Sequence, residues 1–306
     1  MAILTEVWAR DIAEKLFPSD SFVMQAVSDS AWVNNKTVHR PQAGALPGVV
    51  INRSSFPAAS AQRTDTDNSY DMDEFTSDPT LIRDIEEVEV SYAKRQSVLQ
   101  GHISQLNVKI ANQIAYRWAP SNAGNILRTT GANTAANTPA ATGLRKMLTL
   151  NDLLLAKNTF DDMDVPAENR YILLPATMFN NLVNAEKSIL LSSDFRSDAT
   201  VKDGMVTKIF GFNIFTRGRE NVLRFNNAGT PVAIAPTTDG AATDNAAALI
   251  WHKDFVAQAK GSVKVYSDID KPEYYGSVFS AMARAGGQKI YTGQTGVLAI
   301  VEAVGA

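Results

Sequence analysis

The sequence contains no cysteine and only three histidines in 306 residues. The absence of cysteine excludes disulfides, thiol catalysis and cysteine-ligated zinc or iron–sulfur centres. The histidines, His39, His102 and His252, stand far apart in the chain, so a histidine metal site or acid–base pair is not expected. Nucleotide-binding loops and the HExxH and GxSxG motifs are also missing. We therefore expect no metal, no cofactor and no enzymatic activity.

A strong charge of either sign is also lacking, because the formal net charge is -3. Proteins whose main task is to grip nucleic acid carry a clear basic excess, which this chain does not have. The longest apolar run, near Gly296 to Ile300, is far too short to span a bilayer, and Glu6, Arg10 and Asp11 interrupt any signal peptide. We expect a soluble protein without a membrane partner.

The most informative segment that is present runs from about Thr80 to Trp118. A strand pattern, LIRDIEEVEV, leads directly into a helical pattern over about residues 91–118, which would be roughly 40 Å long. Apolar residues recur at the three- and four-residue spacing of one helix face: Leu99, Ile103, Leu106, Ile110, Ile114 and Trp118. A helix of this length predicts an extended subunit that reaches its neighbours.

A second face of this helix is basic and polar. It carries Lys94, Arg95, His102 and Lys109 within about a third of the circumference. This face would make weak contact with a phosphate backbone or with acidic residues of a neighbour, or it is an ordinary solvated helix face.

The pattern of the N-terminal 80 residues predicts short elements that form no hydrophobic core of their own. Residues 3–17 have the pattern of a short amphipathic helix, and the following stretch to Asn35 carries apolar residues that need a surface to pack on. Residues 36–80 are rich in proline and polar residues and predict a long hairpin, with a first strand in GVVINRSSF (48–56). Such a hairpin needs a partner surface within the subunit or across an interface.

Acidic residues gather in this hairpin, with no lysine or arginine between Arg63 and Arg83. The sequence favours a solvated acidic loop that meets basic residues of a neighbour, and a pair of catalytic carboxylates is the alternative. The candidate intersubunit contacts are Arg53, Arg63, Asp65, Asp67, Asp71, Asp73 and Glu74.

The rest of the chain predicts mixed helices and strands. Residues 120–143 are nearly free of charge and predict a flexible crossover. Thr149 and Asp152 form a capping-box pattern before a helix, YILLP predicts a buried strand, and Gly211 predicts the turn of a hairpin. From Ala246 onward the pattern is mostly strands, with GQTG as a turn.

The order of these segments resembles the major capsid proteins of tailed bacteriophages with the Hong Kong 97-like fold. DIEEVEVSYAKRQSVLQGHISQL resembles the strand that enters the spine helix of that family, and KIFGFNIFTRGR resembles the hairpin of its apical domain. AALIWHKDFVAQAK followed by YYGSVFSAMARAGG resembles the return into its peripheral domain.

The resemblance implies an α+β fold and a structural role. Its expected divisions are an N-terminal arm (1–35), an extended loop (36–80), a peripheral domain with the spine helix (81–120 and 250–306) and an axial domain (121–249). The chain would form hexamers and pentamers of an icosahedral shell that encloses double-stranded DNA. Its implied partners are scaffolding, portal and cement proteins, and it would assemble in the host cytoplasm and remain in the virion.

Two other functions stay open at this point. One is an encapsulin-like compartment that holds enzyme cargo, and the other is a soluble carboxylate-dependent hydrolase that uses Asp71 or Asp73.

Overall fold

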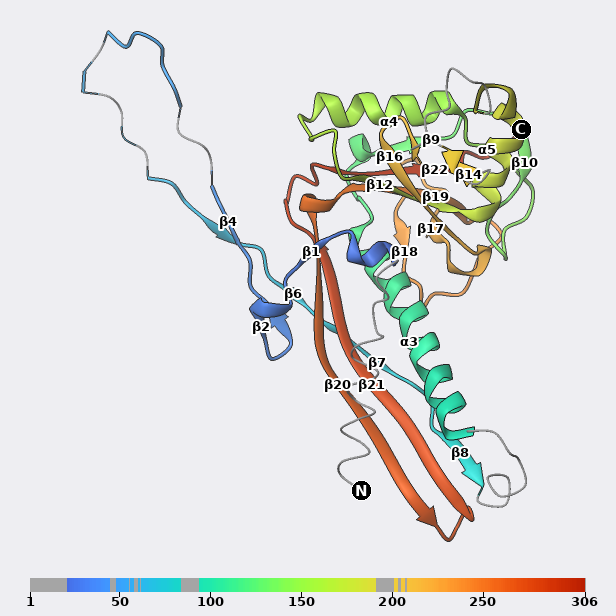
Figure 1. Cartoon of the computed structure of the whole chain (residues 1–306). Helices are drawn as coiled ribbons and strands as arrows, with labels where there is room; N and C mark the ends of the chain where they lie inside the picture. Colours follow the sequence, from blue (N-terminus) through green and yellow to red (C-terminus); the bar gives the residue numbers. More distant parts are fainter. Residues whose placement is uncertain are drawn as a thin grey trace.

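The computed structural model describes residues 21–44, 48–54, 56–57, 60, 62–83, 94–190, 201–202, 205–206 and 208–305. The expected helix over 3–17 and the entry into the spine helix at 84–93 lie outside these residues. Figure 1 shows an elongated subunit with three parts: a rounded body, a long arm of two strands and a helix, and a loop that projects away from both.

The arm is built on a long antiparallel hairpin, β20 (Val256–Lys271) and β21 (Gly276–Lys289). One edge carries the short parallel strand β1 (Val27–Ser28), and the other carries β7 (Asp73–Thr76) and β8 (Thr80–Arg83), which both pair with β21. Helix α3 (Lys94–Trp118) runs along this sheet (Figure 1). A long helix in this segment is therefore confirmed.

The body is built on an eight-stranded sheet of mixed direction. Its strands are β9 (Ile126–Arg128), β12 (Arg170–Pro175), β15 (Lys208–Ile209), β16 (Phe212–Arg217), β17 (Leu223–Phe225), β18 (Ala233–Ile234), β19 (Asn245–His252) and β22 (Val297–Val301). Helices α4 (Leu150–Asp162) and α5 (Ala176–Leu190) accompany it, and two short pairs lie beside it: β10 (Asn133–Ala135) with β11 (Leu144–Lys146), and β13 (Val201–Lys202) with β14 (Met205–Val206). Short 3-10 turns complete the described elements: η1 (Phe22–Met24), η2 (Ser30–Trp32), η3 (Ala123–Asn125), η4 (Arg219–Asn221) and η5 (Lys253–Phe255).

Strand β19 is buried along its whole length because both faces of the sheet are covered. Ala248 and Ile250 belong to one core with α4 and α5, whereas Leu249 and Trp251 belong to a second core that includes the end of α3. Alternate residues of a strand point to opposite faces, so a strand covered on both sides reads as a continuous apolar run.

The second core joins the body to the arm. Trp118 of α3 is fully buried, its indole N–H donates to the Ala257 carbonyl oxygen at 2.9 Å, and its ring lies 5.6 Å from that of Trp251. Phe22 packs edge-on against both indoles. The apolar residues of the N-terminal stretch therefore find part of their surface within the same subunit, although Trp32 stays exposed.

Several local predictions are confirmed. Thr149 and Asp152 form the capping box at the start of α4, and the β15–β16 hairpin turns at Phe210 and Gly211, both with positive φ. Glycine accepts such a φ without steric cost.

The expected flexible crossover over 120–143 is wrong. This segment carries β9, which pairs in parallel with β22, and its Asn125 amide donates to the carbonyl oxygens of Gln294 and Val297. The polar composition reflects hydrogen bonds to backbone groups.

The strand pairing also differs from the expected domain boundary at residue 250. Strand β22 lies between β19 and β9 in the sheet of the body, and β19 itself runs on to His252. Residues 297–301 therefore belong with the body.

Candidate functional site: the extended loop and the groove beside the long helix

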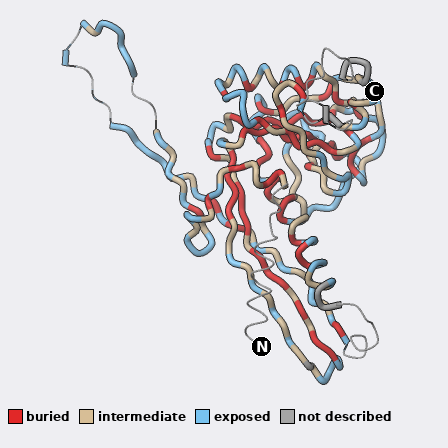
Figure 2. The backbone as a smooth tube through the Cα atoms, viewed as in Figure 1, coloured by how far each residue is buried: buried red, intermediate tan, exposed pale blue. Residues whose placement is uncertain are grey.

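The extended loop leaves the subunit as two strands of chain that pair only near its root. Strand β3 (Thr37–Val38) pairs with β6 (Tyr70–Asp71) and with β2 (Val33–Asn34), and β4 (Pro41–Gln42) pairs with β5 (Thr66–Asp67). Beyond these pairs the loop projects away from the body, and Figure 2 shows its described residues as almost entirely exposed. The antiparallel pairing expected of a hairpin is thus present near the root of the loop.

The far part of the loop, which we call the loop tip (residues 48–54 and 56), carries exposed apolar side chains. Val49 is 89% exposed, Ile51 83% and Phe56 78%. The strand expected over 48–56 is wrong, because these residues have no strand assignment. A β-prone sequence remains irregular where no neighbouring strand supplies hydrogen-bond partners.

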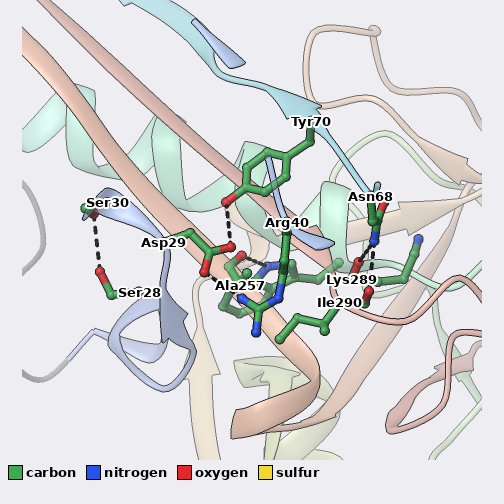
Figure 3. Close-up of polar contacts among 10 residues, drawn as sticks. Ser28, Asp29, Ser30, Arg40, Asn68, Tyr70, Ala257, Lys289 and Ile290 are labelled. Carbon is green, nitrogen blue, oxygen red and sulfur yellow. Dashed lines mark hydrogen bonds and ion pairs between the residues drawn. The ribbon is translucent and has the colours of Figure 1, made fainter. Parts of the chain in front are cut away.

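The root of the loop is held by a buried acid. Asp29 forms an ion pair with Arg40 at 2.6 Å and accepts a hydrogen bond from the Tyr70 hydroxyl at 3.3 Å (Figure 3). Burial raises the pKa of Asp29 although Arg40 opposes the shift, and burial beside Asp29 raises the pKa of Tyr70. Arg40 and Tyr70 are 11 and 41 positions from Asp29 in the sequence. No local spacing in the sequence therefore predicts this cluster.

A second contact fixes the returning strand of the loop. The Asn68 amide donates to the carbonyl oxygens of Lys289 and Ile290, at 3.3 and 2.8 Å (Figure 3). It also accepts from the Gln288 amide at 2.8 Å. The chain then crosses the sheet at Met72, which is buried against two glycines. A Cβ on Gly286 would lie 3.2 Å from Met72, so the crossing strand sits close to the sheet backbone.

The acidic residues of the loop first contact their own chain. Asp65 pairs with Arg63 at 2.6 Å, Asp67 lies 2.8 Å from His39, and Asp71 accepts from the Thr37 hydroxyl at 2.7 Å. The contacts of Asp67 and Asp71, together with the Gly44 N–H that donates to Asp65 at 2.9 Å, hold the two strands of the loop together near its root.

The next two acidic residues, Asp73 and Glu74, belong to β7 and form ion pairs within the arm. Asp73 pairs with Arg117 of α3 at 2.9 Å, and Glu74 pairs with Arg284 of β21 at 3.0 Å. Arg53, in the loop tip, is half-buried and makes no ion pair within the described part of the chain.

These contacts also bear on the hydrolase alternative, which requires two carboxylates that face a shared pocket. Instead, Asp71 is bonded to Thr37 and Asp73 to Arg117 and Gln113. Nowhere in the described residues do three or more His, Asp or Glu side chains converge.

The apolar seam of α3 lies against the arm and body. Ile103, Leu106, Ile110 and Ile114 are buried in the core, and Leu99 is partly buried against it. On the other face Lys109 is exposed, whereas the side chains of Lys94 and Arg95 lie outside the described part of the structure.

His102 does not lie on the open face expected from the helical wheel. It is 8% exposed and lies among Val98, Leu99 and residues of β20 and β21. Burial lowers the pKa of His102. Position 102 is near the apolar seam, and the arm sheet is wide enough to cover it.

A groove of about 930 Å³ separates α3 from the β7–β8 edge of the arm. Most of its lining side chains are polar, with a few apolar ones among them, and it ends at the 236–237 segment of the body. The lining includes Phe75, Asp78, Val98, Gln105, Leu106 and Lys109. The described helices include none that is long and apolar enough to cross a membrane.

The comparisons with known proteins agree with this geometry. A family model described as phage capsid protein matches residues 108–302. No curated protein matches the sequence.

Solved structures share the fold at low identity. The capsid of the cyanophage P-SCSP1u is 18% identical, with a TM-score of 0.63 over 92% of this chain and 87% of its own. The capsid of Ralstonia phage GP4 is 12% identical, with a TM-score of 0.61 over 96% and 91%. A virus-like particle from Pyrococcus furiosus is 11% identical, with a TM-score of 0.54 over 97% and 99%.

The family match covers well over half of the chain and favours a phage shell over an encapsulin-like compartment. The chain belongs to the phage capsid protein family: it is a structural major capsid protein with the Hong Kong 97-like fold.

Proposed function

We propose that copies of this chain form hexamers and pentamers of an icosahedral shell around double-stranded DNA, with each extended loop lying over a neighbouring subunit. The observation that carries the proposal is the loop itself, whose root is fixed and whose tip exposes Val49, Ile51 and Phe56. Exposed apolar side chains on a projecting segment mark a surface that another protein covers.

The division into parts follows the strand pairing. Residues 21–35 begin within the subunit core, residues 36–72 form the extended loop, and α3 with β7, β8, β20 and β21 forms the peripheral domain. The axial domain takes residues 121–252 and also 297–301, because β22 completes its sheet.

Contact with DNA would be weak in this proposal. Lys109 is exposed on the open face of α3, and Lys94 and Arg95 precede it on the same helix. A chain with a net charge of -3 lets DNA enter and leave, whereas a strongly basic inner wall would bind many phosphates and oppose release.

The remaining partners follow from the same function. Scaffolding, portal and cement proteins would join the shell, and assembly would take place in the host cytoplasm. In the shell, Arg53 and the loop acids that stay exposed, Asp65, Asp67 and Asp71, would meet the neighbouring subunit.

Electron microscopy of the purified recombinant protein tests the proposal. Closed particles of uniform diameter, eluting in the megadalton range, are the expected result. A monomer or small oligomer under all assembly conditions would overturn it. Particles purified from infected cells should hold nuclease-protected DNA, whereas a cargo enzyme would indicate a compartment.

The hydrolase alternative has its own test. It requires that Asp71→Asn or Asp73→Asn remove an activity of the unassembled subunit, and we expect neither variant to do so.

A further inference from the structure

A pocket of about 250 Å³ lies where the C-terminal half of α3 meets the body. The helix contributes Asn112, and the body contributes η4, the adjoining part of β17 and the segments 138–140 and 236–240. The two segments approach closely, because a Cβ on Gly240 would lie only 2.6 Å from the Ala140 Cβ. This volume is below that of pockets for drug-sized ligands, so the pocket suits a small ion or molecule.

One buried polar group that lines this pocket has no partner. Thr138 is 1% exposed, and its hydroxyl makes no hydrogen bond within the described residues. Buried hydroxyl groups are otherwise almost always hydrogen-bonded, because an unpartnered one loses its contact with water and gains nothing in return. The Thr138 hydroxyl therefore indicates that the pocket takes a ligand with an acceptor atom.

Two further donors line the same pocket. The Arg219 guanidinium donates through Nη2 to the carbonyl oxygens of Thr138 and Ala136, at 2.9 and 3.3 Å, and its Nε and Nη1 make no hydrogen bond in the described part of the chain. Asn221 accepts from the Asn112 amide at 2.9 Å through Oδ1, so its own NH2 group also stays available as a donor. These groups favour a ligand that is rich in acceptor oxygens.

A second arginine adds positive charge at the junction of α3 and the body. Arg217 donates to the Asn112 Oδ1 at 2.5 Å, and its guanidinium lies 5.4 Å from the centre of the Phe22 ring. Burial lowers the pKa of Arg217 to about 10, and no carboxylate pairs with it within the described residues. The junction therefore holds a partly buried cation that lacks an anion.

The acids beside the pocket oppose an anion only weakly. Asp244 is already paired with Arg224 at 3.0 Å, whereas Glu220 and Asp239 are exposed. Charges in contact with solvent are screened by salt, so their repulsion is small at the buried end of the pocket.

We propose that this pocket binds a phosphate group, with the Arg219 guanidinium, the Thr138 hydroxyl and the Asn221 amide as its donors. Arginine binds phosphate oxygens through parallel hydrogen bonds, and donors from two different segments suit a tetrahedral oxyanion better than a planar carboxylate. Because Asn221 is bonded to α3 through Asn112, the bound phosphate would also tie the arm to the body. The inference goes beyond the shell function and does not depend on it.

Isothermal titration calorimetry of the unassembled subunit with inorganic phosphate tests the site. Thr138→Val removes the hydroxyl and keeps the shape of the side chain, so we expect the affinity for phosphate to fall about tenfold. Its melting temperature without phosphate should not fall, because the lost hydroxyl makes no hydrogen bond within the described residues. Arg219→Gln should weaken phosphate binding at least about tenfold. The matched control Arg83→Gln, exposed on β8 far from the body, should leave it unchanged (Figure 1).

A duplex oligonucleotide in the same titration separates the two sources of a phosphate group. If Thr138→Val weakens the binding of inorganic phosphate alone, the pocket takes the free ion; if it weakens both, the pocket also takes a phosphate of the DNA backbone. No saturable binding of inorganic phosphate to the parent subunit, or equal affinity in the parent and in Thr138→Val, would overturn the site. Neither result bears on the shell, because particle formation is scored separately by electron microscopy.

Discussion

Asp29 and Arg40 form an ion pair of 2.6 Å at the point where the extended loop leaves the subunit. The carboxylate is almost fully buried, and its remaining oxygen accepts from Tyr70, on the returning strand of the loop. Asp29 directly follows β1, and its backbone N–H donates to the Gln258 carbonyl oxygen. This one acid therefore connects β1 with the outgoing and the returning strand of the loop.

Arg40→Ala should lower the free energy of unfolding by about 2 kcal/mol, because a buried carboxylate loses its cation. Arg63→Ala is the matched control, since its pair with Asp65 has the same 2.6 Å distance but is exposed. We expect the control to leave the free energy of unfolding nearly unchanged, because an exposed ion pair is screened by solvent. Chemical denaturation of the unassembled subunit measures both, and equal losses would contradict a special role for the root.

Ile110→Asp should unfold the subunit, because it forces a charge into the fully buried seam of α3. The expected loss is at least about 4 kcal/mol. Gln100→Asp introduces the same group at an exposed position of the same helix and should leave the melting temperature nearly unchanged. A folded, soluble Ile110→Asp subunit would show that the helix packs differently.

Ile51→Asp should abolish shell assembly while the subunit keeps its melting temperature, because residue 51 is exposed in the isolated chain. Ser54→Asp adds the same charge in the same loop without removing an apolar side chain and should reduce assembly far less. Light scattering and electron microscopy follow assembly. Normal particles from Ile51→Asp would remove the loop tip from the interface.

Acidification below pH 6.5 should destabilise the subunit. Burial lowers the pKa of His102 and of His252, so the unfolded chain binds more protons than the folded chain between the lowered values and 6.5. Stability therefore falls as the pH drops through that window. His102→Leu should flatten the dependence of melting temperature on pH between 7 and 5, whereas Gln105→Leu on the same helix should not; an unchanged slope in His102→Leu would refute this assignment.

Asp152→Ala should cost more stability than Thr149→Ala. Removing the Thr149 hydroxyl loses one capping bond, at about 1 kcal/mol. The Asp152 carboxylate accepts from the Thr149 backbone at 3.0 Å and also from the Thr130 backbone and hydroxyl at 3.2 and 2.6 Å. Thermal unfolding of the two variants gives the order, and the reverse order would mean that the Thr130 contacts contribute nothing.

The sequence predicted the elements whose pattern is local. The seam of Ile103, Leu106, Ile110 and Ile114, the capping box at Thr149 and the turn at Gly211 each depend on residues a few positions apart, and each is present. The helical wheel also placed His102 on the open face of α3, and this prediction is wrong. How much of a helix is buried depends on the width of the sheet beside it, and here β20 and β21 extend over His102.

The misses all involve partners distant in sequence. Residues 126–128 join the body only because 297–301 arrive beside them, so no local pattern marked β9 as a strand. Conversely, residues 48–54 have a strand pattern but pair with no strand among the described residues. The groove is likewise invisible in the sequence, because its two walls are separate segments brought together by pairing with β21.

The position of β22 has a consequence for the order of events in the cell. This strand lies between β19 and β9, so β9 stays separate from the sheet and one edge of the fully buried strand β19 stays uncovered until residues 297–301 are in place. Contacts over such sequence separations form slowly and leave sticky edges exposed in the meantime. Newly made chains therefore need to close this sheet before they meet at high concentration, and the rate of that closure sets how fast shells can grow without aggregation.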